Sequence, residues 1–117
     1  MTDQERIQGT WRLLTGERQG KALPDEAVQD VSLAFAGDRL STRSKGRVTE
    51  ARFTLTPGTD PKGIDLDMGG AVGLGIYLLA GDDLKIAHGE VGDPRPTAFA
   101  AKEGAPLTIL VLKRVRQ

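Results

Sequence analysis

Gly9-Thr10-Trp11, preceded by Ile7-Gln8, is the stretch of sequence that decides the fold. Upstream of it, Thr2 and Glu5 stand three positions apart, the spacing of a capping box, which predicts a short helical turn. Gly9 ends this turn, because glycine adopts backbone conformations that do not continue a helix. From Trp11 onward the pattern becomes extended, and we expect Trp11, Leu13 and Thr15 to share one face of a first strand.

The rest of the chain continues this extended pattern. Apolar residues recur at every second position in seven further segments, and glycine- or proline-containing turns separate most of them. The eight expected strands cover residues 11–15, 31–36, 40–45, 49–55, 64–68, 72–79, 84–88 and 107–114. Pro24 before Asp25 predicts one short helix between the first two strands. The sequence therefore predicts an all-β, eight-stranded, antiparallel up-and-down barrel, because closing a meander removes its exposed edges.

Composition limits the classes of protein to which this chain can belong. Its 117 residues suffice for a single domain, residues 1–117. The sequence has no cysteine, which excludes disulfides and thiol catalysis. Sixteen basic residues balance sixteen acidic ones, so we expect neither nucleic acid nor a membrane surface as a partner. The longest apolar run, residues 71–80, is shorter than a membrane span, and residues 1–11 have no apolar signal core. We therefore expect a cytoplasmic location.

The two ends of the expected barrel carry a resemblance. Gly9 and Trp11 follow the helical turn, and Arg114 lies near the end of the last strand. This arrangement resembles lipocalin-like (calycin-type) barrels, which begin with a helical turn and Gly-x-Trp and place a basic residue of the final strand over the tryptophan ring. The resemblance implies that Gly9, Trp11 and Arg114 form the barrel floor, with a cation–π contact of about 0.5–2 kcal/mol.

Further segments extend this resemblance over residues 7–114. They are Ile7–Trp11, Gly20–Pro24, Phe35–Asp38, Ile64–Leu66, Gly75–Tyr77, Leu84–Ile86, Arg95–Phe99 and Val111–Arg114. Together they resemble an uncharacterised bacterial family, abundant in planctomycetes, of small lipocalin-like domains. The chain departs from that pattern in a shorter loop at Gly69-Gly70 and in His88, where the family tends to have an apolar or aromatic residue. The resemblance implies a fold and no activity.

His88 is the only histidine and the first candidate for a binding site. It alternates with Leu84 and Ile86, so we expect it to point inward near the mouth of the barrel. There it is either a group that hydrogen-bonds or carries a proton at a pocket, or a partly buried histidine at a strand end. We expect Tyr77, His88 and Arg95 to orient a small ligand, with Phe53 adding apolar surface. The sequence does not decide whether Tyr77 points into the barrel or away from it, because both faces of its strand are apolar.

Catalytic, metal and cofactor sites are not expected. A catalytic triad needs a nucleophile and an acid beside the histidine, and no serine of this sequence stands in such a signature. Asp65 and Asp67 alternate with Ile64 and Leu66, so they should be solvated carboxylates on the outer face and not metal ligands. The sequence favours a protein that is not an enzyme.

Two functions remain at this point. The first is a binding module that holds a small apolar or amphipathic molecule in the barrel interior. The second is a structural or protein-interaction domain with a filled barrel, acting through a homodimeric or partner interface. Residues 72–79 and 107–112 are apolar on both faces of their strands, which predicts a homodimer that buries their outer faces.

Overall fold

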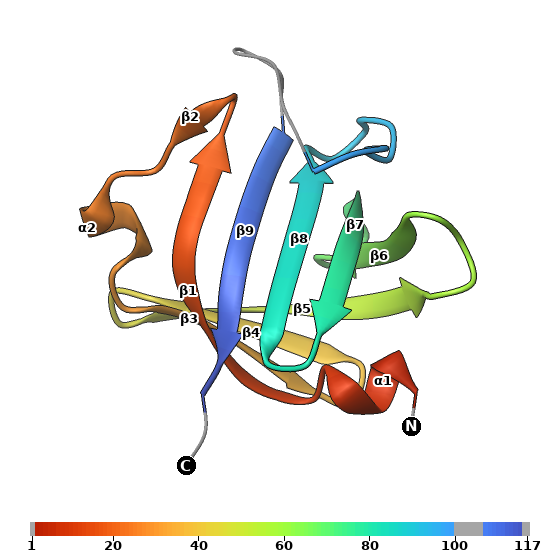
Figure 1. Ribbon diagram of the computed structural model, residues 1–117, viewed down its shortest axis with the longest axis horizontal. Coiled ribbons are helices and arrows are strands. Elements are labelled where there is room, and N and C mark those ends of the chain that lie inside the picture. Colours follow the sequence, from red (N-terminus) through yellow and green to blue (C-terminus); the bar gives the residue numbers. More distant parts are fainter. Residues whose placement is uncertain (1, 100–106, 116–117) are drawn as a thin grey trace.

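The computed structural model describes residues 2–99 and 107–115, and these form one antiparallel barrel. The elements in chain order are α1 (Asp3–Arg6), β1 (Gly9–Arg18), β2 (Lys21–Ala22), α2 (Asp25–Val28), β3 (Val31–Ala36), β4 (Arg39–Ser44), β5 (Arg47–Thr56), β6 (Lys62–Asp67), β7 (Val72–Ala80), β8 (Asp83–Gly89) and β9 (Leu107–Arg114). From β3 to β9 each strand pairs with the next, and β1 pairs with both β3 and β9. Eight strands close the barrel and β2 lies outside it (Figure 1). The predicted lipocalin-like architecture is confirmed.

The two short helices lie where the sequence predicts them. Thr2 caps α1: its hydroxyl accepts a hydrogen bond from the Glu5 amide, and the Glu5 side chain accepts one from the Thr2 amide. Pro24 directly precedes α2. Both described helices are four residues long, and neither has the length or apolar character to cross a membrane.

The floor of the barrel is built around Trp11. This side chain is fully buried, and its indole nitrogen donates a hydrogen bond of 2.9 Å to the carbonyl of Ile7. The guanidinium carbon of Arg114 lies 4.3 Å from the centroid of the indole ring, within the range of a cation–π contact. Gly9 has a φ of +117°, and a Cβ there would lie 3.4 Å from the Arg114 side chain. The expected floor of Gly9, Trp11 and Arg114 is therefore confirmed.

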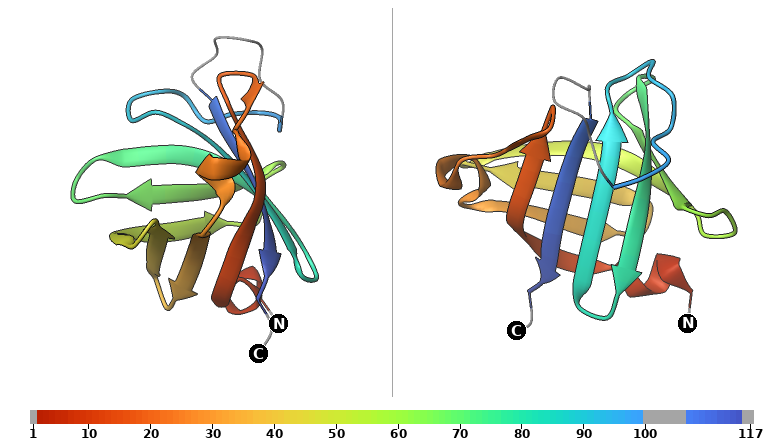
Figure 2. Two further views of the ribbon diagram at one scale, coloured as in Figure 1. Left: turned by 90° about the vertical axis from the view of Figure 1, so that its left-hand side faces the viewer. Right: turned by 45° about the horizontal axis from the view of Figure 1, so that its top comes forward.

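Arg114 also joins the two ends of the chain through hydrogen bonds. Its guanidinium donates to the carbonyl of Gln8 at 2.9 Å and to the carbonyl of Arg6. The same side chain forms an ion pair with Asp82 at 3.3 Å. Both views of Figure 2 show α1 at the end of the barrel where β9 finishes. One side chain thus holds the start of β1, the end of β9 and the β7–β8 turn together.

A β-bulge at Leu14 interrupts β1. Leu13 pairs with Leu112, but Thr15, two residues later, pairs with the adjacent Val111. An extra residue on one strand reverses which side chains face the interior. Thr15 is accordingly exposed, and the prediction that it shares the face of Trp11 and Leu13 is wrong. Beyond the bulge, even-numbered residues face inward, so Gly16 is buried.

The chain itself covers part of the outer apolar surface. Ile76, Ala87 and Ile109 face outward from β7, β8 and β9, yet they are buried against Phe99 and Leu107. The segment that carries Phe99 therefore hides much of the surface that we expected a homodimer to bury. Leu78, farther along β7, stays 53% exposed.

Replacing Trp11 with alanine should lower the free energy of unfolding by about 3–5 kcal/mol, because a large buried side chain leaves a cavity. Arg114→Ala should lower the free energy of unfolding by a smaller amount. The double variant should lower it by less than the sum of the two single decreases, because both single changes remove the same stacking contact. Urea unfolding followed by circular dichroism measures all three, with Arg12→Ala, an exposed arginine of β1, as the control. Two neutral single variants would contradict the assigned floor.

Candidate functional site

The end of the barrel opposite the floor contains a cavity of about 680 Å³. Most of its wall is aliphatic, formed by Leu13, Leu33, Leu40, Leu66, Ile86 and Leu110. Sites for small molecules are typically apolar cavities of about 300–1,000 Å³ with a few polar groups, so this one has the size and character of a ligand pocket.

The sizes of the inward-facing side chains explain why this end is hollow. Phe35 and Phe53 meet edge to face at the floor end, with their ring centroids 5.0 Å apart, beside the fully buried Trp11. At the other end the wall includes Ala51 and Gly73, which fill little space. No heavy atom outside the adjacent residues lies within 4 Å of the position that a Cβ on Gly73 would take. The cavity is the space that these small residues leave.

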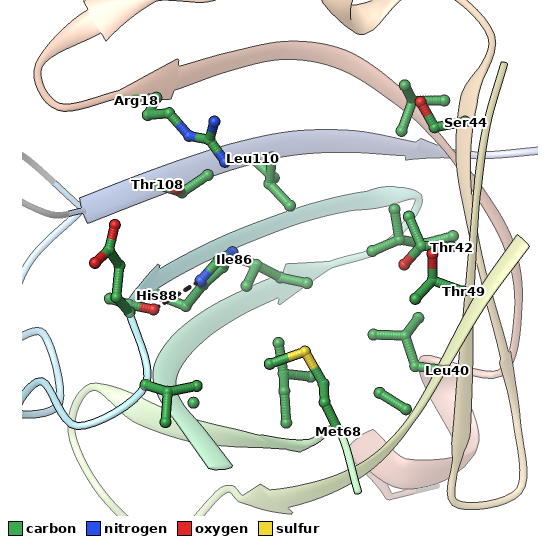
Figure 3. A pocket seen from close by; sticks show the side chains of 18 of the residues that line it. Arg18, Leu40, Thr42, Ser44, Thr49, Met68, Ile86, His88, Thr108 and Leu110 are labelled. Atoms are coloured by element: carbon green, nitrogen blue, oxygen red, sulfur yellow. Dashed lines mark hydrogen bonds between the residues drawn. The ribbon is translucent and has the colours of Figure 1, made fainter. Parts of the chain in front are cut away.

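A polar row crosses three adjacent strands at one level of the cavity wall. Thr108 of β9 pairs with Arg18 of β1 on one side and with His88 of β8 on the other. All three residues line the cavity. Figure 3 shows them together at one side of the pocket, with Ile86 and Leu110 beside them. The confirmed inward position of His88 is therefore one member of a larger polar group.

The register also fixes what lies below this row. One step toward the floor, Leu110 pairs with Gly16 of β1 and with Ile86 of β8. One step further, Leu112 pairs with Leu13 and Leu84. The cavity wall thus changes from polar to aliphatic within one residue pair.

Three hydroxyl groups line the opposite wall. Thr42 and Ser44 come from β4, and Thr49 of β5 pairs directly with Thr42. Figure 3 shows them across the pocket from Arg18 and His88, with Met68 between the two groups. A ligand in this cavity would meet hydrogen-bonding groups on two sides and aliphatic groups toward the floor.

The ring of His88 is oriented by its own strand end. Its Nδ1 lies 3.1 Å from the carbonyl oxygen of Gly89, which accepts a hydrogen bond when that nitrogen carries the proton. Nε2 is then the polar atom of the ring that remains for a ligand. In the part of the chain that the structure describes, no hydroxyl or carboxylate hydrogen-bonds to this ring, so the pairing that a triad needs is not assembled.

Tyr77 faces the interior but belongs to the floor and does not line the cavity. Its hydroxyl donates a hydrogen bond of 2.7 Å to Asp3 of α1, and the same carboxylate oxygen accepts one of 2.9 Å from Lys62. Burial, together with the hydrogen bond to Asp3, raises the pKa of Tyr77 well above its ordinary value. The hydrogen bond from Lys62, and then the one from Tyr77, lowers the pKa of Asp3. Tyr77 therefore anchors α1 and is not positioned to orient a ligand.

Phe53 and Arg95 also lie outside the cavity. Phe53 is part of the floor core, because it stands lower on β5 than Ala51 and Thr49. Arg95 lies on the outer face of the sheet, where its guanidinium donates to the Gly75 carbonyl at 2.8 Å and pairs with Asp65 at 2.7 Å. Of the four ligand-binding residues expected from the sequence, His88 alone lines the pocket.

Arg18 and Thr108 are the members of the polar row that the sequence reading missed. Alternation from Trp11 would place Arg18 on the outside, and only the bulge at Leu14 turns it inward. The available signal was Gly16, because a glycine inside a strand often accompanies a bulge. Thr108 lies on a strand with apolar residues on both faces, so the pattern did not separate inside from outside there.

Comparisons with protein-family models, with curated proteins and with solved structures find no match to this chain. The resemblance to small bacterial lipocalin-like domains thus stays a prediction from the motifs. Within residues 2–99 and 107–115, no three side chains of a type that binds metals gather closely enough to hold an ion.

The contact between Asp3 and Tyr77 predicts a change in stability at both extremes of pH. Because the pKa of Asp3 is lowered from 3.8, the ionised carboxylate stabilises the folded protein fully above pH 3.8. This contribution is lost as the pH falls through the lowered pKa. Because the pKa of Tyr77 is raised from 10.0, its stabilisation is complete below pH 10.0 and is lost at more alkaline pH.

Asp3→Asn should therefore weaken the loss of stability in acid, and it should lower the free energy of unfolding by about 1–2 kcal/mol near neutral pH. Tyr77→Phe should weaken the loss of stability at alkaline pH. Urea unfolding measured across the pH range tests both variants. Glu17→Gln, which changes an exposed carboxylate of β1, is the control. Unchanged pH profiles in both variants would contradict the assigned role of this contact.

Proposed function

We propose that this protein is a non-enzymatic binding module that holds one small apolar or amphipathic molecule inside its barrel. The observation that carries the proposal is the cavity of about 680 Å³, with aliphatic walls toward the floor and polar groups on two sides. An eight-stranded barrel is just wide enough either to be filled by its own side chains or to hold one small ligand. The small residues Ala51 and Gly73 in the wall favour the second use.

The alternative is a domain that acts by contact with another protein through its outer face. Leu78 supports it, because this side chain is 53% exposed on the outer face of β7. Lys85, paired with Leu78 and Val111, lies between these two apolar residues. Burial of Ile76 and Ile109 by the chain itself leaves this surface smaller than the sequence indicated. A monomeric mass in light scattering at micromolar concentration would contradict a homodimer on this face.

Gly73 offers a direct test of binding in the cavity. Gly73→Phe should fill the pocket and weaken binding of the neutral fluorescent probe N-phenyl-1-naphthylamine by about tenfold or more. Gly73→Ala adds one methyl group in open space, so it should bind the probe like the unaltered protein. The alanine variant should also be more stable by about 0.4–1 kcal/mol, because glycine has more freedom to lose on folding.

Fluorescence titration measures binding, and circular dichroism shows that both variants are folded. If the folded Gly73→Phe variant binds the probe as tightly as the unaltered protein, then the probe does not occupy this cavity. If the unaltered protein does not bind the probe or a linear alcohol of similar size, the proposed function is wrong.

A further inference from the structure

We propose that the ligand is a single-chain amphiphile with a carboxylate head, held at the polar row of Arg18, Thr108 and His88. Its hydrocarbon chain would extend from this row toward the aliphatic walls near the floor. This inference rests on the proposed function and specifies the chemical class of the ligand.

The first support is that a cation stands at the mouth of the barrel, on the inner face of the sheet. The bulge at Leu14 turns Arg18 to the inner face, where it pairs with Thr108 and lines the cavity. None of the described carboxylates forms an ion pair with Arg18, whereas Arg95 and Arg114 are both paired. A guanidinium carries five N–H donors in a planar fork that matches a carboxylate. An anionic head group is the partner that this side chain lacks.

The second support is that the rest of the row completes the site. Thr108 adds a hydroxyl between Arg18 and His88, and the Nε2 atom of His88 is a further polar atom at the same level. Across the pocket, Thr42 and Thr49 add two hydroxyls (Figure 3). Hydroxyls both donate and accept, so the Thr108 hydroxyl, beside Arg18, can donate to an oxygen of the same carboxylate.

The third support is the chemistry below the row. The next two levels toward the floor are formed by Leu110 and Ile86 and then by Leu13, Leu112 and Leu84. A charged group there would lose its hydration without a partner, whereas a hydrocarbon chain gains by leaving water. The order of the wall from polar to aliphatic therefore matches an amphiphile that enters chain first.

Two carboxylates of the cavity lining bear on the charge of the ligand. Glu50 pairs with Ser41, faces the outer surface by alternation and also lines a second, external pocket beside Arg39 and Arg52. Glu90 follows His88 at the rim and is exposed, as Arg18 is, so water screens both charges. Among the described lining residues, Arg18 is the only arginine or lysine, and the register places it on the inner face beside Thr108.

Three probes with the same hydrocarbon chain test the inference: dodecanoate, dodecanol and dodecylamine. Each displaces N-phenyl-1-naphthylamine from the unaltered protein at about pH 8, where a carboxylate is ionised, and below the micellar concentration of each probe. We expect dodecanoate to bind about tenfold more tightly than dodecanol, and dodecylamine to bind most weakly.

Variants of Arg18 then assign the preference to the row. Arg18→Gln should remove the advantage of dodecanoate over dodecanol, and Arg18→Glu should make dodecylamine the preferred probe. Arg12→Gln is the matched control, because Arg12 lies on the same strand, is exposed and pairs with Ser32 and Lys113 on the outer face. It should leave the order of the three probes unchanged.

The outcomes separate this inference from the function on which it rests. If no probe binds, the proposed function fails and the inference fails with it. If dodecanol binds as tightly as dodecanoate, or if Arg18→Gln leaves the preference unchanged, the carboxylate inference is overturned while binding in the cavity stands. Loss of the preference in Arg18→Gln and its retention in Arg12→Gln is the result that supports the inference.

Discussion

The contact between Arg114 and Trp11 is the constraint on which the barrel depends. A meander of strands becomes a barrel only when its first and last strands pair, and unpaired edges would otherwise expose backbone groups. Here β1 pairs with β9, and the Arg114 guanidinium lies 4.3 Å from the Trp11 ring centroid at the end of that pairing. The same guanidinium donates to the carbonyls of Arg6, the last residue of α1, and of Gln8, so one side chain links the closure of the sheet to the floor.

The closed floor also explains where a ligand can bind. The large aromatic side chains gather on the Trp11 side, with Tyr77 held by Asp3 of α1. The cavity lies at the other end, where Gly73 and Ala51 line the wall. The bulge in β1 then directs Arg18 into that end. Aromatic packing at one end and the bulge in β1 together produce a pocket with an aliphatic interior and a polar level above it.

Much of the fold could be predicted from the residues, and much of the site could not. The eight strands, both short helices and the floor of Gly9, Trp11 and Arg114 follow from alternation, capping and the resemblance at the chain ends. His88 was correctly expected to point inward near the mouth. The position of Arg95 was predicted wrongly, because it depends on an ion pair with Asp65 on the outer surface. The alternation of apolar and polar residues along a strand does not reveal such a contact.

What the sequence by itself determined is that successive side chains of each strand take opposite faces of the sheet, because alternation is a local property of extended backbone. What only the tertiary structure decided is the level of each side chain along the barrel. That level depends on the register between strands, and it separates Phe53 and Tyr77 at the floor from His88 at the mouth. One inserted residue in β1 changed even the facing of Arg18, because a bulge is defined by the pairing of two strands and not by alternation within one strand.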